Sequence, residues 1–190
     1  MTAWLVLSSV VKSSSTRAWL SRRHLSTTTT SVSITCPVSC QMADWASRFV
    51  DLAHVVAGWS KDPSTQVGAV ITDDRNRIIS LGFNGVPRSC REPGGRDEKL
   101  HRTIHAEQNA MAFAECDLRG ARIFVTHAPC AQCAAMIVQR GISLVCFDVR
   151  STETAFFERW KDSHQQAMNM LYEAGVTIIP YTGGPNDETL

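Results

Sequence analysis

The spacing of hydrophobic positions changes along the chain between the period of a helix and that of a strand. In residues 44–58 apolar side chains recur at intervals of three and four, which predicts an amphipathic helix capped by Asp44. Residues 66–72 and 77–83 are short apolar segments on either side of a polar turn, which predicts a β-hairpin. We therefore expect a helix followed by two antiparallel strands.

The rest of the chain alternates between the two periods. A polar, Pro- and Gly-containing stretch at 87–102 predicts a surface flap. After it come, in turn, a helix, a strand, a helix, a strand, a helix and a strand, at residues 105–114, 122–126, 130–140, 144–147, 155–174 and 176–181. This alternation predicts parallel strands with helices on both faces. The expected fold is a three-layer α/β/α domain over residues 42–181 with a mixed five-stranded sheet, followed by a frayed tail at 182–190.

Residues 1–41 have a different composition from the rest of the chain. They hold 17 Ser or Thr and four basic residues but no acidic one, which is a poor basis for a packed core. Two interpretations remain open. Either the segment is a disordered extension that targets the protein to mitochondria, or Met42 is the true start and the protein is cytoplasmic.

The charge of the remaining chain limits its partners. Four of the 19 basic residues lie in 1–41, so the other 15 face all 18 acidic residues and residues 42–190 carry a net charge of −3. Polynucleotide partners favour a basic face, so we expect none here. No stretch approaches the roughly 18 uninterrupted apolar residues that a membrane span requires.

Two short motifs carry candidate chemistry: His105-Ala106-Glu107 and Pro129-Cys130-Ala131-Gln132-Cys133. Cys130 and Cys133 are three residues apart at a predicted helix start, where thiolates are favoured and both sulfur atoms lie on one face. The intervening strand brings this helix and the one that His105 opens to one end of the sheet. One imidazole and two thiolates leave the fourth position of a tetrahedral zinc ion open for water, and Glu107 is free to carry protons. The motifs predict a catalytic Zn²⁺ site.

Other interpretations of these residues are less specific. A Cys-x-x-Cys pair alone also fits a redox pair or half of a structural zinc site, but a closed zinc site needs a fourth ligand, and none stands at a motif spacing. The other five of the seven cysteines show no pairing pattern, which favours a reduced compartment. Cys116 and Cys146 are expected in the core. Cys90 and His101 are too few ligands to predict a second zinc.

Four stretches together resemble the cytidine deaminase superfamily, most closely its deoxycytidylate (dCMP) deaminases of phage and bacterial type. The resemblance covers about residues 42–181 and is carried by Trp59-Ser60-Lys61-Asp62-Pro63-Ser64-Thr65-Gln66-Val67-Gly68-Ala69, Gly82-Phe83-Asn84-Gly85-Val86-Pro87-Arg88, His105-Ala106-Glu107-Gln108-Asn109-Ala110 and Thr126-His127-Ala128-Pro129-Cys130-Ala131-Gln132-Cys133-Ala134. The last two are shared by the whole superfamily. The first two are similar to the dCMP branch and narrow the substrate.

The resemblance implies a function and a set of roles. His105, Cys130 and Cys133 would bind Zn²⁺, and Glu107 would be the general acid and base in the hydrolytic deamination of dCMP to dUMP and ammonia. It also implies a homo-oligomer, often a hexamer in this family. The Cys/His-containing insertion that holds a second zinc in some members is short here, and control by dCTP and dTTP stays open because its residues cannot be mapped.

Residues for nucleotide binding are expected in the two dCMP-like stretches. Asn84 is expected to hold the sugar, because its amide both donates and accepts; the alternative is a turn-forming Asn-Gly. Lys61, Ser64, Thr65 and Arg88 are candidates for the 5′-phosphate, with a solvated surface role as the alternative for each. His127 either contacts the substrate or packs beside the site.

Three other functions compete with dCMP deamination. The same zinc chemistry serves deaminases of other cytosine nucleosides or nucleotides and of adenosine in tRNA, although the acidic body disfavours tRNA. The third alternative is a non-catalytic assembly protein stabilised by zinc, for which Glu107 would have no use.

Overall fold

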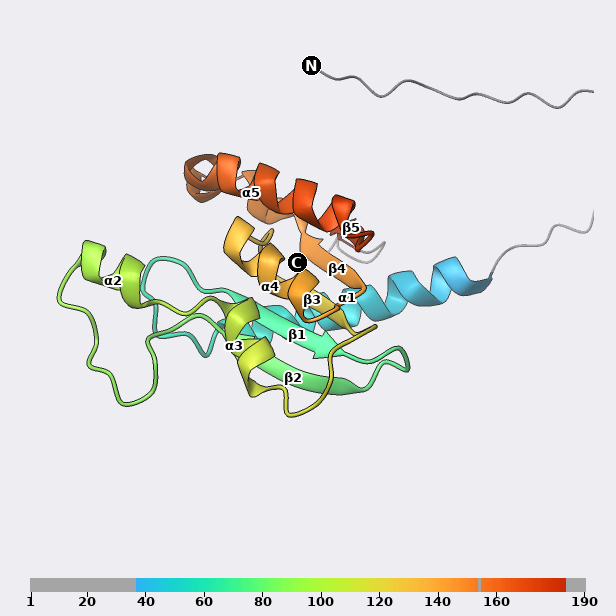
Figure 1. Cartoon of the computed structure of the whole chain (residues 1–190), viewed down its shortest axis with the longest axis horizontal. Coiled ribbons are helices and arrows are strands. Elements are labelled where there is room, and N and C mark those ends of the chain that lie inside the picture. Colours follow the sequence, from blue (N-terminus) through green and yellow to red (C-terminus); the bar gives the residue numbers. More distant parts are fainter. Residues whose placement is uncertain (1–36, 154, 184–190) are drawn as a thin grey trace, which may run out of the picture. The chain divides into compact units, whose positions relative to one another are not determined.

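The computed structural model describes residues 37–153 and 155–183 (Figure 1). The helices are α1 (Pro37–Ala57), α2 (Arg96–Arg102), α3 (Ala106–Phe113), α4 (Ala131–Gln139) and α5 (Ala155–Glu173), with a short 3₁₀ helix, η1 (Val149–Glu153). The strands are β1 (Gly68–Thr72), β2 (Ile78–Phe83), β3 (Arg122–Val125), β4 (Leu144–Asp148) and β5 (Thr177–Tyr181). The element order of residues 66–181 follows the sequence prediction, except for α2 and η1.

The five strands form one mixed sheet in the order β2-β1-β3-β4-β5. Strand β1 pairs antiparallel with both β2 and β3, whereas β3, β4 and β5 are parallel. The predicted hairpin therefore supplies the antiparallel edge, and the helical crossovers supply the parallel part. This confirms the predicted mixed five-stranded sheet.

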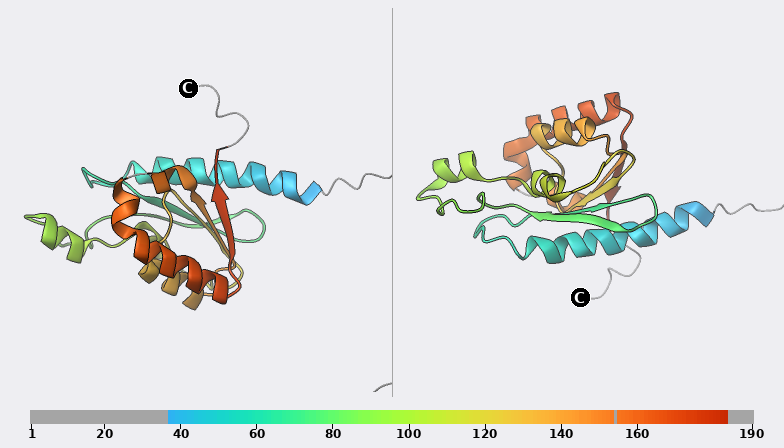
Figure 2. Two further views of the ribbon diagram at one scale, coloured as in Figure 1. Left: turned by 90° about the horizontal axis from the view of Figure 1, so that it is seen from above. Right: turned by 60° about the horizontal axis from the view of Figure 1, so that its bottom comes forward.

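Helices cover both faces of this sheet (Figure 2). On one face α1 packs Phe49, Val50 and Ala53 against Val70 and Phe124 of the sheet. On the other face α3, α4 and α5 enclose a second cluster of buried side chains, which includes Ala110, Ile137 and Leu171. Burial of these apolar faces on both sides of the sheet stabilises the three layers. The predicted α/β/α architecture is confirmed.

Two glycines allow helices to approach the sheet unusually closely. A Cβ atom on Gly82 in β2 would lie 2.3 Å from the carbonyl oxygen of Ala106 in α3. A Cβ atom on Gly68 in β1 would lie 2.0 Å from the carbonyl oxygen of Ala53 in α1. Only a residue without a side chain fits at either point. Gly82 therefore sets how near the first turn of α3 comes to β2.

Three details of the prediction were wrong. Helix α1 begins at Pro37, so Asp44 lies within the helix and not at its N-terminus. The predicted flap contains the helix α2. None of its residues is buried, so its sequence has no apolar periodicity that would predict a helix. Cys116 is exposed, whereas Cys146 is buried as expected.

The predicted extension lies mostly outside the described residues. Residues 1–36 and 184–190 are not described, so the expectations for the extension and for most of the tail remain predictions. Of the helices that are described, none combines the length and the apolar content needed to cross a bilayer.

Candidate metal centre

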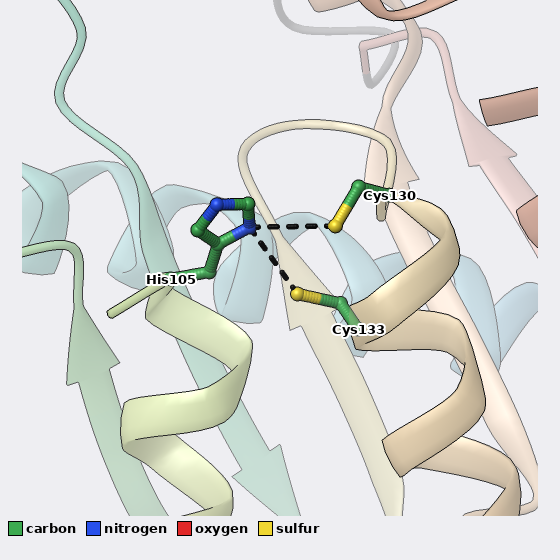
Figure 3. A group of neighbouring side chains, drawn as sticks. All are labelled: His105, Cys130 and Cys133. Atoms are coloured by element: carbon green, nitrogen blue, oxygen red, sulfur yellow. Dashed lines mark hydrogen bonds between the residues drawn. The ribbon is translucent and has the colours of Figure 1, made fainter. Parts of the chain in front are cut away.

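His105, Cys130 and Cys133 meet at the adjoining N-termini of α3 and α4 (Figure 3). The Nδ1 atom of His105 lies 3.4 Å from Sγ of Cys130 and 3.4 Å from Sγ of Cys133. A tetrahedral zinc ion with usual bond lengths holds its nitrogen and sulfur donors about 3.5 Å apart. The three donor atoms all lie within 4.8 Å of one another, and within the described ranges they are the one such group of three. The donor set fits zinc.

Local hydrogen bonds fix the helix start that carries His105. His105 and Cys130 are the N-cap residues of α3 and α4, and His105 forms a capping box with Gln108. In this box the side-chain oxygen of Gln108 accepts a hydrogen bond from the backbone N–H of His105 (3.2 Å). The amide of Asn109 donates to the carbonyl of Phe83 at 2.7 Å and ties α3 to β2. These contacts hold the first turn of α3, and with it His105, in place beside β2.

The surroundings of Cys130 and Cys133 shift the pKa values of their thiols in opposite directions. Hydrogen bonds from Cys133 and His105 outweigh burial and lower the pKa of Cys130 to about 4. The hydrogen bond to Cys130 and burial raise the pKa of Cys133. One thiolate therefore forms readily, and a second forms only if a cation joins them. A dication such as zinc supplies the missing positive charge.

Glu107 lies in the first turn of α3 and is 4% exposed. Burial is the largest influence on this carboxyl group and raises its pKa, although the charge of His105 acts in the opposite direction. Burial that raises the pKa of a carboxyl group makes it easier for that group to hold a proton, which it can then release to a neighbour. This is the behaviour expected of a proton carrier beside a metal-bound water.

The loop between α1 and β1 is organised by Asp62, which the sequence analysis did not identify. Its Oδ1 accepts hydrogen bonds from the backbone N–H of Ser64 (2.8 Å) and Thr65 (3.1 Å) and from Nζ of Lys99 in α2 (2.6 Å). Burial acts to raise the pKa of Asp62, but these hydrogen bonds outweigh it and the pKa is lowered. The contact between Lys99 and Asp62 joins the flap to this loop. No local sequence pattern predicts this contact.

Asn84 belongs to the same network and is 6% exposed. Its Oδ1 accepts from the N–H of Val67 (2.8 Å), and its Nδ2 donates to the carbonyl of Thr65 (2.9 Å) and to Oδ2 of Asp62 (3.4 Å). Both amide hydrogens are therefore used within the protein, and Oδ1 keeps a second lone pair for a ligand. The structure brings Asn84, Ser64 and Thr65 together.

The two predicted basic residues have different surroundings. Lys61 is exposed in the loop that Asp62 organises. Arg88 is also exposed, and its guanidinium lies 4.6 Å from the ring centre of Phe113 at the end of α3. Arg88 is thus held by a cation–π contact rather than by the Asp62 network. Cys90 and His101, the pair considered for a second zinc, are both exposed.

An open pocket of about 560 Å³, lined by residues of polar and charged types, lies at the carboxyl ends of β3 and β4. Asp148 and His127 line it together with His54 of α1, whose Nε2 lies 2.9 Å from Oδ2 of Asp148. Burial and the neighbouring His54 lower the pKa of His127. His127, which lines this pocket, lies three residues before Cys130 in the sequence. The pocket lies at the edge of the sheet formed by the carboxyl ends of the strands, where ligands usually bind in α/β folds. His127 was a candidate because it directly precedes the Pro-Cys motif, whereas no motif contains His54 or Asp148.

A sequence profile described as the cytidine and deoxycytidylate deaminase zinc-binding region matches residues 43–149, and so spans both motifs. The chain belongs to this deaminase family. Within this deaminase, the matched region contains His105, Glu107, Cys130 and Cys133.

Individual relatives agree with this assignment. The deaminase is 49% identical over 140 residues to an uncharacterized deaminase from the luxG 3′ region of Aliivibrio fischeri, an alignment that covers 72% of this chain and 93% of that relative. It is 35% identical over 161 residues to the deoxycytidylate deaminase of Mus musculus, covering 76% of this chain and 86% of the mouse protein.

A solved structure shares the fold. The apo dCMP deaminase of the cyanophage S-TIM5 superposes with a TM-score of 0.57 at 23% identity, covering 74% of this chain and 97% of the phage protein. The expected cytidine deaminase-like fold is thereby confirmed.

Proposed function

We propose that this deaminase hydrolyses dCMP to dUMP and ammonia with Zn²⁺ as its cofactor, in pyrimidine deoxynucleotide metabolism. The observation that carries the proposal is the group of His105, Cys130 and Cys133 with the buried Glu107 beside it. The mouse relative that aligns over most of its length is a deoxycytidylate deaminase. The phage protein with the same fold was crystallised with dCMP and dUMP. Both support a cytosine nucleotide as the substrate.

The proposed cofactor site uses the three side chains that the fold assembles. His105 would bind zinc through Nδ1, and Cys130 and Cys133 through their sulfur atoms. Zinc supplies a Lewis acid that lowers the pKa of a bound water to near neutrality. With three protein ligands, the set leaves one tetrahedral position open, as catalytic rather than structural zinc sites do.

Glu107 would move the protons of the reaction. Its carboxylate takes a proton from the water that attacks C4 of the cytosine, and delivers a proton to N3 of the ring. The carboxylate would then take the remaining proton from the hydroxyl group added at C4 and give it to the C4 amino group. The C4–N bond breaks, ammonia leaves, and the C4 oxygen becomes the carbonyl oxygen of the uracil ring. Burial raises the pKa of the Glu107 carboxyl group, which favours its holding a proton between the two transfers.

The Asp62 loop is the proposed binding region for the sugar and the 5′-phosphate. Asn84 would accept from a sugar hydroxyl through the second lone pair of Oδ1. Lys61, Ser64 and Thr65 would meet the phosphate from the loop that Asp62 holds in shape, and Arg88 would approach from the neighbouring stretch.

We also propose that the protein acts as a homo-oligomer. Large apolar side chains are exposed on several helices, among them Val55, Leu100 and Tyr172, at 61%, 55% and 82%. Such side chains favour association with a second copy. Light scattering coupled to gel filtration, repeated with dCTP and dTTP, would give the subunit number and reveal any effector response.

The location in the cell depends on the N-terminal segment. We propose that the protein is located in the cytoplasm if translation starts at Met42, and in mitochondria if residues 1–41 form a transit peptide. Mass spectrometry of the N-terminus of the protein from its native host separates the two proposals.

A comparison of substrates tests the proposed activity. Release of ammonia is measured with dCMP, CMP, deoxycytidine, cytosine and tRNA under the same conditions. The proposal predicts that dCMP has the highest kcat/KM. Greater activity on a nucleoside, on CMP or on tRNA would overturn the proposed substrate, and no activity on any of them would favour the non-catalytic alternative.

A further inference from the structure

Two adjacent residues of α5 hold the backbone on both sides of Cys130. The Oγ atom of Ser163 accepts a hydrogen bond from the backbone N–H of Ala131 at 3.0 Å. The Nδ1 atom of His164 lies 2.9 Å from the carbonyl oxygen of Pro129. These groups belong to the two peptide bonds that flank Cys130, so α5 fixes the residue from before and from after.

The direction of the His164 bond follows from its partner. A carbonyl oxygen only accepts hydrogen bonds, so Nδ1 of His164 must carry the hydrogen. The side chain is 5% exposed, and water competes little for this bond. One and two turns further along α5, Ala167 and Leu171 are fully buried against the sheet side of the core. The two contacts therefore come from a helix that is itself firmly packed (Figure 1).

Cys130 differs from a usual N-cap residue, because its side chain belongs to the metal centre. The N-cap residue of a helix usually accepts a backbone N–H with its own side chain and so fixes the turn. Cys130 is the N-cap of α4, but its side chain points to the metal centre and makes no capping hydrogen bond. Ala131 is the first residue of α4, and its N–H has no partner within the helix. Ser163 satisfies this N–H from another helix.

We propose that Ser163 and His164 are positioning residues of the metal centre, which hold the Cys130 turn so that its sulfur stays in place relative to Cys133 and His105. The proposal rests on the proposed zinc site. It assigns to α5, which contributes no ligand, a direct part in metal retention. Groups that orient metal ligands typically change metal affinity by about 10- to 100-fold when they are removed.

A purely structural role makes a different prediction. If His164 only helped α5 to pack on α4, its replacement would lower stability and leave metal binding unchanged in the folded protein. Leu171→Ala is the matched control for that case, because Leu171 is a fully buried residue of α5 whose side chain has no group that could hydrogen-bond to the Cys130 turn. This control removes buried apolar volume and lowers the free energy of unfolding.

The test measures zinc release to a chromogenic chelator well below the thermal midpoint, on the full chain. His164→Leu keeps apolar bulk but removes the donor, and we expect zinc release about 10- to 100-fold faster than from the parent. Asn carries its amide nitrogen on Cγ, as His carries Nδ1, so His164→Asn is expected to restore release to within about threefold of the parent. Ser163→Ala is expected to speed release about fivefold. Leu171→Ala is expected to release zinc at the parental rate.

The cobalt-substituted proteins give a second readout. The visible bands of Co²⁺ report the geometry of its ligands, so His164→Leu is expected to shift them and His164→Asn to restore them. Parental zinc release and parental cobalt bands in His164→Leu would overturn the proposal. Equal acceleration in His164→Leu and Leu171→Ala would also overturn it. A parent protein that binds no zinc would instead overturn the proposed function itself.

Discussion

Replacing Gly82 with alanine is expected to disturb the metal centre from the neighbouring strand. The new Cβ would lie 2.3 Å from both the carbonyl oxygen of Ala106 and the backbone nitrogen of Ala110, whereas ordinary contact begins at 3.4 Å. Both neighbours are backbone atoms of α3, so no side chain can turn away. The helix must retreat from β2 by about 1 Å, the difference between these distances.

This displacement falls on the two functional groups that α3 carries. His105 is the N-cap of α3 and Glu107 lies in its first turn, so both move with the helix. A misplacement of about 1 Å can reduce catalysis about 100-fold, which corresponds to about 2.7 kcal/mol of transition-state stabilisation. Overpacking of this kind also costs about 1–3 kcal/mol of stability.

The assay compares kcat/KM for dCMP, zinc content and the thermal midpoint in three alanine variants. Gly95→Ala is the neutral control, because no heavy atom lies within 4 Å of its added Cβ and its φ of −169° is open to any residue. Gly68→Ala overpacks α1 on the opposite face and is expected to lower stability with a much smaller loss of turnover. Parental kcat/KM and stability in Gly82→Ala would refute this reasoning.

Three further predictions concern the loop, an acidic group and the metal. Asp62→Asn weakens the hydrogen bonds that shape the loop and is expected to raise KM for dCMP about tenfold without changing zinc content, as steady-state kinetics and metal analysis can check. Burial acts to raise the pKa of Asp148, but hydrogen bonds from Arg150 and His54 outweigh it and lower the pKa below its usual range. Its contribution to stability is then complete above the unfolded pKa and is lost as pH falls through the folded value. Urea unfolding should therefore find Asp148→Asn less stable than the parent at pH 7, with a difference that narrows as pH falls below the usual pKa range of an aspartate. Chelation of the metal is expected to abolish turnover and lower the thermal midpoint, and added Zn²⁺ is expected to restore both; activity that survives complete metal removal would contradict the proposed cofactor.

Most of the fold could be predicted because each helix or strand that packs in the core has its own pattern of apolar residues in a short stretch of sequence. Apolar runs such as residues 66–72 and 144–147 identify the strands, since each packs against helices on both faces. The start of α1 was missed because Asp44 has the chemistry of an N-cap, although Pro37 suits the first turn of a helix equally well. Helix α2 was missed because no buried residue marks it.

The candidate site was predictable where its residues are neighbours in sequence. His105 with Glu107, and Cys130 with Cys133, each form a compact motif with a chemical meaning of its own. The supporting residues carry no such signal. Ser163 reaches Ala131 across 32 positions, and His54 reaches Asp148 across 94. These pairs exist only because the helices pack on the sheet, so single-sequence patterns could not reveal them.

Glu107 is proposed to carry the protons of the reaction, and one pair of measurements tests this role most directly. Glu107→Gln keeps the size of the side chain but cannot carry a proton. The purified parent and variant are compared for zinc per chain and for dUMP formed from dCMP. We expect equal zinc content and a loss of turnover of at least about 100-fold in the variant. A variant with full zinc content and parental turnover would contradict the account.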